Sequence, residues 1–175
     1  MQVKRNWLIL SGTRQNVGKT TVACNLTMHY KELGVVAIKI SPHMHTLTPG
    51  LRLLYEQDGI QIAQETEISG KDTGRYLQAG AHKAYYLQCH DDLLQQALIW
   101  LLPFIPEDVP VICESAKARG FIEPGVFVML GLSEDFNRKP DVQAIALNPH
   151  LHFTSFEVFD YECIEFVNRM WCIVS

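Results

Sequence analysis

The stretch Leu8–Thr21, L-I-L-S-G-T-R-Q-N-V-G-K-T-T, predicts a strand, a glycine-bounded loop and the start of a helix. The apolar run Trp7–Leu10 is typical of a buried strand, and apolar residues at helical spacing begin after Thr21. A helix N-terminus presents backbone N–H groups that have no partner within the helix, and the helix dipole favours an anion beside them. The order of strand, loop and helix therefore predicts a phosphate-binding loop.

Two side chains of this stretch bring the chemistry that phosphate binding needs. Lys19 supplies a positive charge for the phosphates, and Thr20 offers a hydroxyl group to Mg²⁺. The spacing departs by one residue from the pattern G-x-x-x-x-G-K-[ST], because five residues separate Gly12 from Gly18. Arg14 either folds over the phosphates or points into solvent. The predicted nucleotide-binding residues are Gly12, Thr13, Arg14, Gln15, Asn16, Val17, Gly18, Lys19, Thr20 and Thr21.

The rest of the chain predicts a single α/β domain over residues 1–175. A helix over Thr20–Leu33 that ends at Gly34, followed by a strand over Val35–Ile40, completes a β-α-β unit and implies a parallel sheet. Asp58-Gly59 between two β-prone runs predicts a hairpin insertion over about residues 51–68, with a dimer contact or a substrate flap as open roles. We expect helices at Lys71–Ala81 and from an Asp91 cap to about Leu102, and strands at Ala84–Cys89, Val109–Cys113, Val126–Leu132 and Val142–Leu147.

The C-terminal segment, Phe153–Ser175, is less regular than the rest. Phe156, Val158 and Phe159 indicate a strand, and the spacing over Tyr161–Met170 favours a helix. The chain ends in an apolar run, so we expect its end to pack on the core.

Lys39 and Glu114 stand at the ends of predicted strands. In parallel α/β folds, the ligand crevice lies at the carboxyl ends of the strands. Glu114 is either a metal contact, direct or through water, or an ordinary cap or salt-bridge carboxylate. Lys39 is either a ligand for a phosphate or a substrate anion, or a surface lysine. His43 and His45 follow the same strand as Lys39 and are expected in a loop that contacts substrate.

Two further pairs of residues have open roles. Asp72 and Arg75 lie one helical turn apart and either pair with each other or face the crevice. His150 and His152 follow a predicted strand, as His43 and His45 do, so a shared metal site is conceivable but lacks a matched cysteine or carboxylate.

Composition limits the class of partner and the compartment. Hydrophobic residues make up 47% of the chain and the formal net charge is −4, with no basic block, so nucleic acid and an anionic membrane are not expected partners. Five cysteines without a C-x-x-C pair favour free thiols in a reducing cytoplasm. The apolar run near the N-terminus is too short for a signal peptide.

The loop Gly12-Thr13-x-x-x-Val17-Gly18-Lys19-Thr20 is similar to the phosphate loop of dethiobiotin synthetases, and it fits the wider class that includes cobyrinic acid amide synthetases. The middle of the chain resembles the MobB-type proteins of molybdopterin-guanine dinucleotide biosynthesis. Those proteins carry a lysine and histidines after their second strand, where Lys39, His43 and His45 stand here.

Two further motifs carry the resemblance to MobB-type proteins. Their G-K-D-S-x-R followed by A-G-A is matched by Gly70–Arg75 and Ala79–Ala81, and their strand ending in V-E-G is matched more loosely by Ile112–Ser115. The loop spacing is that of dethiobiotin synthetases, whereas MobB-type loops are shorter, and Ser115 replaces the glycine after the acid. The likeness covers about Trp7 to Leu132, and the segment from Ser133 matches neither family.

The resemblance implies a three-layer P-loop NTPase-like fold that binds Mg²⁺ with ATP or GTP. It implies a slow NTPase or an adaptor in cofactor biosynthesis, with a protein of that pathway and a second copy of the chain as candidate partners. An ATP-dependent ligase or small-molecule kinase acting on a carboxylate or amine, and a degenerate P-loop protein acting through protein contacts, are alternatives. The expected catalytic residues are Lys19, Lys39 and Glu114, the metal contacts Thr20 and Glu114, and the substrate contacts His43, His45, Asp72 and Arg75.

Overall fold

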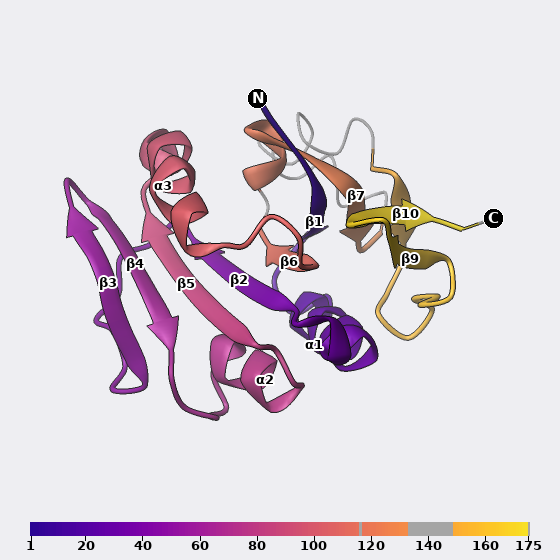
Figure 1. The fold of residues 1–175 in the computed structure, drawn as a ribbon, viewed down its shortest axis with the longest axis horizontal. Coiled ribbons are helices and arrows are strands. Elements are labelled where there is room, and N and C mark those ends of the chain that lie inside the picture. Colours follow the sequence, from indigo (N-terminus) through magenta and orange to yellow (C-terminus); the bar gives the residue numbers. More distant parts are fainter. Residues whose placement is uncertain (116, 133–148, 175) are drawn as a thin grey trace.

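The computed structural model describes residues 1–115, 117–132 and 149–174, and its centre is an eight-stranded sheet with the order β3-β4-β5-β2-β6-β1-β7-β8 (Figure 1). Strands β1, β2, β5, β6, β7 and β8 run parallel, while β3 and β4 join antiparallel at one edge. The expected α/β class with a mainly parallel sheet is confirmed. The strands are β1 (Gln2–Gly12), β2 (Val36–Ser41), β3 (Leu51–Gln57), β4 (Ile60–Glu65), β5 (Lys83–Cys89), β6 (Val111–Glu114), β7 (Ile122–Leu130) and β8 (Leu151–Phe153).

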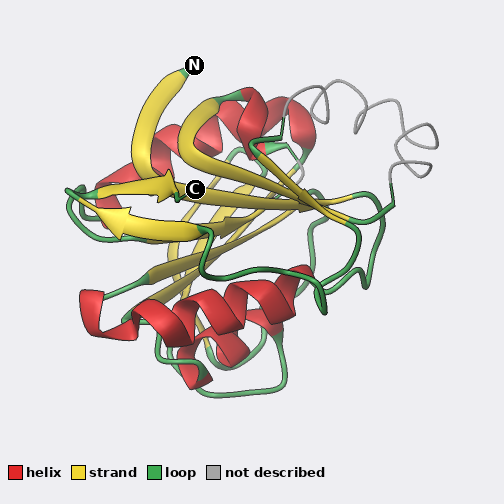
Figure 2. Ribbon diagram, turned by 90° about the vertical axis from the view of Figure 1, so that its right-hand side faces the viewer, coloured by secondary structure: helices red, strands yellow, loops and turns green. Residues whose placement is uncertain are grey.

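Helices cover both faces of this sheet (Figure 2). On one face lie α1 (Lys19–Tyr30) and α2 (Asp72–Gln78), and on the other lies α3 (Leu94–Leu101). Alternate residues of β1 pack on opposite faces of the sheet: Trp7 and Ile9 on the α3 side, and Leu8 and Leu10 on the α1 side. A strand buried on both faces explains the continuous apolar run at the start of the chain.

Short 3₁₀ turns extend or connect these elements. They are η1 (Lys31–Leu33), η2 (Asp91–Leu93), η3 (Leu102–Phe104) and η4 (Ala118–Gly120). Asp91 was expected to cap the helix, but it begins the turn before α3, where His90 is the cap residue, and its carboxylate pairs with Lys117. Because of this turn, α3 begins at Leu94 and not directly after Asp91.

The expected hairpin is present as β3 and β4 and belongs to the main sheet through the antiparallel pairing of β4 with β5. Asp58 and Gly59 form its two-residue turn with φ values of 50° and 79°. Positive φ at both central positions matches the twist of the paired strands, which is why this dipeptide marks a hairpin in sequence.

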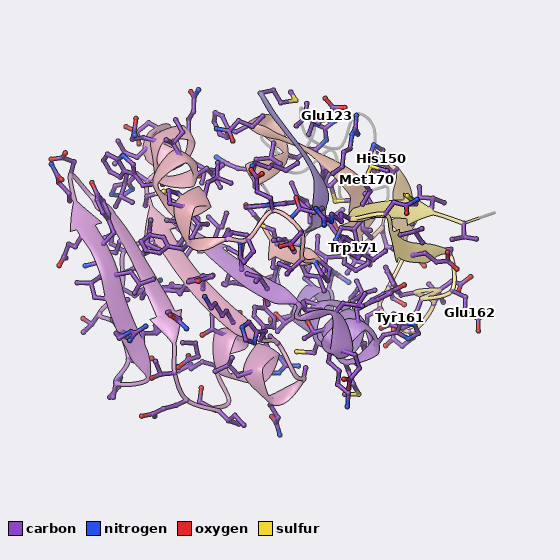
Figure 3. The ribbon with its side chains drawn as sticks, in the orientation of Figure 1. Glu123, His150, Tyr161, Glu162, Met170 and Trp171 are labelled. Atoms are coloured by element: carbon purple, nitrogen blue, oxygen red, sulfur yellow. The ribbon has the colours of Figure 1, made fainter. Side chains whose placement is uncertain are left out.

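The expectation of a helix over Tyr161–Met170 is wrong. The segment forms a second hairpin, β9 (Ile164–Val167) and β10 (Met170–Ile173), closed by Asn168 and Arg169 with φ values of 53° and 62°. This hairpin lies on the α1 side of the sheet, and Figure 3 shows Trp171 pointing inward from it. The Trp171 ring packs edge-on at 5.0 Å from the Tyr30 ring, and its indole N–H donates to the Val111 carbonyl at 3.1 Å.

The strand expected around Phe156, Val158 and Phe159 is also wrong, because residues 154–163 form bends and turns. Phe159 is buried, and its ring packs at a tilt against those of Phe153 and Tyr161 at centroid distances of 4.6 and 4.7 Å. The aromatic residues here therefore reflect side-chain packing and not strand pairing. The strand expected at Val142–Leu147 lies outside the described residues.

All five cysteines lie in the described residues and are free thiols, as expected. Within the described part of the chain, no helix has the length and apolar content needed to cross a membrane.

Candidate functional site

The loop between β1 and α1 has the backbone that its glycines predict. Gly18 begins the helix with a φ of 92°, and Asn16 also has a positive φ of 59°. A Cβ atom at Gly12 would lie 2.6 Å from Val17 Cγ2, so the loop closes only around a glycine. Val17 is buried, whereas Arg14 and its two following neighbours are exposed. One apolar residue therefore anchors the loop while its polar part faces outward.

Lys19 folds back over this loop. Its ammonium group donates a hydrogen bond to the Arg14 carbonyl oxygen at 3.0 Å. This hydrogen bond holds the positive charge over the loop. The loop leads into α1, whose first backbone N–H groups already favour an anion.

Two buried hydroxyl groups at the base of the loop lack a partner among the described residues. Ser11 and Thr13 are 1% and 3% exposed, and neither side-chain oxygen forms a hydrogen bond there. The Thr13 backbone is fixed by its N–H donating to the Leu130 carbonyl at 2.9 Å. Buried polar groups without partners are rare and call for a ligand, water or ion.

Four of the residues singled out in the sequence meet beside the loop. Thr20 Oγ1 donates to Glu114 Oε2 at 2.8 Å and lies 3.3 Å from Asp72 Oδ1. Lys39 Nζ lies 2.5 Å from Glu114 Oε1 and 2.9 Å from Asp72 Oδ2. A hydroxyl, two carboxylates and an ammonium group therefore form one connected network at the start of α1.

The sheet register brings this network together. Lys39 on β2 is the direct partner of Glu114 on β6, and Glu114 is the partner of Leu10 on β1. Because the three strands are parallel neighbours, their carboxyl ends reach the loop together. Asp72 arrives from the start of α2 on the same side.

Tyr76 completes the network and was not found in the sequence. Its hydroxyl donates to Glu114 Oε2 at 2.6 Å, and the side chain is fully buried. Burial and then the charge of Glu114 raise the pKa of Tyr76 well above its ordinary value, so the hydroxyl stays protonated and donates. The available signal was its position four residues after Asp72, which places both on one face of a helix.

Burial and charge compete in the ionisation of Lys39 and Asp72. Burial disfavours the ammonium group, but the charges and hydrogen bonds of Glu114 and Asp72 outweigh it and raise the pKa of Lys39. Burial likewise disfavours the Asp72 carboxylate, but its hydrogen bond to Lys39 and the charge of Lys39 lower the pKa of Asp72 overall. Both shifts favour the charged forms of Lys39 and Asp72.

A cavity of about 440 Å³ opens beside this network. Lys39 and Asp72 form part of its wall, together with His45 and Lys71, so it carries cationic groups and several hydroxyl groups. Two hydrogen bonds between Gln88 and the backbone of His45 fix the loop after β2. The remaining wall is Ser41, Thr46, Thr48, Leu51, Thr73 and Tyr86.

Not every predicted substrate contact reaches this cavity. His43 and Arg75 are absent from its wall, whereas His45 and Asp72 belong to it. Asp72 forms its ion pair with Lys39 and not with Arg75, whose charge makes a smaller contribution to lowering the Asp72 pKa. Asp72 and Arg75, although one helical turn apart, therefore do not form a surface ion pair with each other.

The two histidine pairs do not form a common metal site. His43 follows β2, whereas His152 lies in β8, four strand positions away, or about 19 Å at the usual strand spacing. His152 Nε2 is hydrogen-bonded to the Gly131 carbonyl at 2.7 Å. Within the described residues, no group of three or more histidine, cysteine, aspartate or glutamate side chains is arranged to hold a metal.

Comparison with known proteins yields no match to a family model, to a curated protein or to a solved structure.

Proposed function

We propose that this chain binds a nucleoside triphosphate with Mg²⁺ at the loop Gly12–Gly18. In this proposal it is a P-loop protein of the MobB-like and dethiobiotin-synthetase-like class, acting as a slow NTPase or an adaptor in cofactor biosynthesis. The observation that carries the proposal is that the Glu114 carboxylate binds both the Lys39 ammonium group and the hydroxyl of Thr20, the residue that follows the loop lysine. A glycine-bounded loop alone indicates phosphate; the adjoining carboxylates indicate a metal-bound phosphate.

The donor set fits Mg²⁺ that arrives with phosphate. Thr20 offers a hydroxyl oxygen, and Asp72 and Glu114 offer carboxylate oxygens, which are the hard ligands that Mg²⁺ prefers. Two carboxylates already paired with Lys39 do not make a metal site by themselves, in keeping with the absence of a metal cluster among the described residues. When bound, Mg²⁺ would neutralise charge on the β- and γ-phosphate oxygens.

The chain's own residues would then act by position and charge. The backbone N–H groups of the loop and of α1 hold the phosphate oxygens, and Lys19 neutralises their charge from its place over the loop. Tyr76 holds the Glu114 carboxylate in one orientation. Lys39 links the metal side of the site to the neighbouring cavity, where it meets a second anion.

The cavity favours a second candidate function, an ATP-dependent ligase or small-molecule kinase. Its volume of about 440 Å³ suits a small organic molecule, and Lys39 and Lys71 suit one that carries a carboxylate or phosphate. Such an enzyme would release ADP faster when an organic acid or amine is added. An adaptor would show slow basal turnover and retain a protein partner in a pull-down.

Thermal unfolding with ATP, GTP and their diphosphates, with and without Mg²⁺, tests the proposal. We expect a Mg²⁺-dependent rise of Tm that grows with nucleotide concentration, since a ligand that binds only the folded state stabilises it. Lys19→Ala should abolish this rise. Lys4→Ala is the matched control, because Lys4 pairs with the exposed Glu107 and should keep the full response.

An unchanged response in Lys19→Ala would contradict phosphate binding by this loop. Absence of any response in the unaltered protein would favour a degenerate P-loop protein that acts through protein contacts.

A further inference from the structure

The segment after β8 returns to the phosphate loop. A Cβ atom at Gly18 would lie 2.4 Å from Phe156 Cδ1 and 2.6 Å from its Cγ, so the Phe156 ring lies directly against the residue that begins α1. The same side chain is 37% exposed. One part of the ring therefore touches the loop while another faces solvent, an arrangement that leaves apolar surface free at a polar site.

Backbone contacts fix this ring relative to the loop. The Thr13 N–H donates to the Leu130 carbonyl and the Gly131 N–H donates to the Phe153 carbonyl, both at 2.9 Å. Further along the chain, the Phe159 N–H donates to the Phe156 carbonyl at 3.3 Å, and Phe159 is buried in the core. Phe156 is thus held between two anchored positions beside the loop.

The strand order separates the carboxylate network from the segment that follows β8. Glu114 on β6 and Lys39 on β2 lie on one side of β1 in the sheet, whereas β7 and β8 lie on its other side. Figure 1 shows β6 and β2 on one side of β1 and β7 on the other. In a triphosphate whose metal-binding end faced Glu114, the nucleoside end would extend away from β6, towards β7 and the segment that follows β8. Phe156 presents its ring on that side, next to Gly18.

We propose that Phe156 is the stacking platform for the base of a nucleoside triphosphate whose phosphates occupy the Gly12–Gly18 loop. The inference rests on the proposed nucleotide binding and adds the subsite that distinguishes a nucleotide from inorganic triphosphate. Aromatic rings stack on any nucleobase through its π-face. The observation behind the platform is the half-exposed Phe156 ring against Gly18, the residue at which the loop meets α1.

Calorimetric titration with Mg²⁺-ATP, Mg²⁺-GTP and Mg²⁺-tripolyphosphate tests the platform. Phe156→Leu keeps an apolar side chain against Gly18 but removes the aromatic face. We expect this variant to weaken nucleotide binding about 5- to 150-fold while its Kd for tripolyphosphate stays that of the unaltered protein. Phe156→Tyr should restore nucleotide affinity, and Val158→Ala, an exposed neighbour two residues on, should leave every Kd unchanged.

The remaining outcomes decide against the platform alone or against both proposals. Equal weakening of nucleotide and tripolyphosphate in Phe156→Leu would overturn the platform, because Phe156 would then support the loop and not the base. Equal affinity of the unaltered protein for nucleotide and tripolyphosphate would overturn it as well. If neither ligand binds the unaltered protein, the proposed function fails and the platform fails with it.

Discussion

Lys39 and Glu114 are register partners in the adjacent strands β2 and β6, and Lys39 Nζ lies 2.5 Å from Glu114 Oε1. The Glu114 side chain is 3% exposed and that of Lys39 is 22% exposed. A buried carboxylate is tolerated only where donors surround it, so the same pair that marks the site also secures the centre of the sheet. The charge state of the site is therefore tied to folding.

Removal of the lysine tests that link. Lys39→Met should lower the free energy of unfolding by about 1–3 kcal/mol, because Glu114 loses its ion pair but keeps Tyr76 and Thr20 as donors. The double variant Lys39→Met with Glu114→Gln should recover part of that loss. Urea unfolding of both single variants and the double variant measures the coupling, and strictly additive losses would contradict it.

The Asp72 ion pair makes stability depend on acid. Because the pKa of Asp72 is lower in the folded protein than its ordinary value of 3.8, the carboxylate contributes stability above that value and loses it as pH falls through the folded-state pKa. We expect Asp72→Asn to lose less stability than the unaltered protein between about pH 5 and about pH 2. Urea unfolding across this range is the measurement, and parallel curves for the two proteins would refute the assignment.

The lysine side of the pair acts at the opposite end of the pH scale. The folded-state pKa of Lys39 lies above its ordinary value of 10.5, so its contribution is present below that value and is lost as pH rises through the folded-state pKa.

The parts of the fold and of the site that sequence could predict are those marked by a local signal or by their place at the end of a strand. Asp58-Gly59 specifies its hairpin within two residues, and Gly18 ends a loop whose backbone requires positive φ. Lys39 and Glu114 could be expected to meet because parallel strands end at one edge. Each of these inferences needs only a turn or an adjacent strand.

The parts that sequence could not predict depend on long-range packing. Tyr76 meets Glu114 across 38 positions in the chain, and its spacing is that of any core residue on a helix. The spacing of apolar residues over Tyr161–Met170 favours a helix, but Asn168 and Arg169 both adopt positive φ without the usual glycine, and the buried Trp171 ties the resulting hairpin to the sheet. Tertiary contacts there outweigh the local pattern.

Tyr76→Phe isolates the hydrogen bond that sequence missed. Loss of the hydroxyl leaves Glu114 without one of its donors, and we expect the free energy of unfolding to fall by about 1–2 kcal/mol. The matched control is Tyr55→Phe, whose hydroxyl bonds to the exposed Gln57 and whose removal should change stability by less than about 0.5 kcal/mol. Equal effects of the two substitutions would show that Glu114 does not depend on Tyr76.

The C-terminal hairpin should contribute strongly to stability through Trp171. Trp171→Ala removes a ring that is 2% exposed and its hydrogen bond to the Val111 carbonyl, so we expect a loss of about 3–5 kcal/mol. The adjacent Met170, labelled in Figure 3, lies in the same strand. It is 39% exposed, and Met170→Ala should change stability by less than about 0.5 kcal/mol. Urea unfolding compares the two; a small effect of Trp171→Ala would mean that the hairpin contributes little to the folded state.

Gly18 carries two constraints at once, and a substitution there separates them. Its φ of 92° strains any residue with a side chain, and an added Cβ would lie 2.4 Å from Phe156 Cδ1. Gly18→Ala should therefore destabilise the protein by about 2 kcal/mol, of which about 1 kcal/mol reflects backbone strain. Gly120→Ala is the control, since a Cβ there meets nothing within 4 Å and stability should stay within about 0.5 kcal/mol.

Adding Phe156→Ala to Gly18→Ala removes the collision but not the strain, so the double variant should be more stable than the sum of the single losses predicts. Simple additivity in urea unfolding would mean that the Phe156 ring does not rest on the loop.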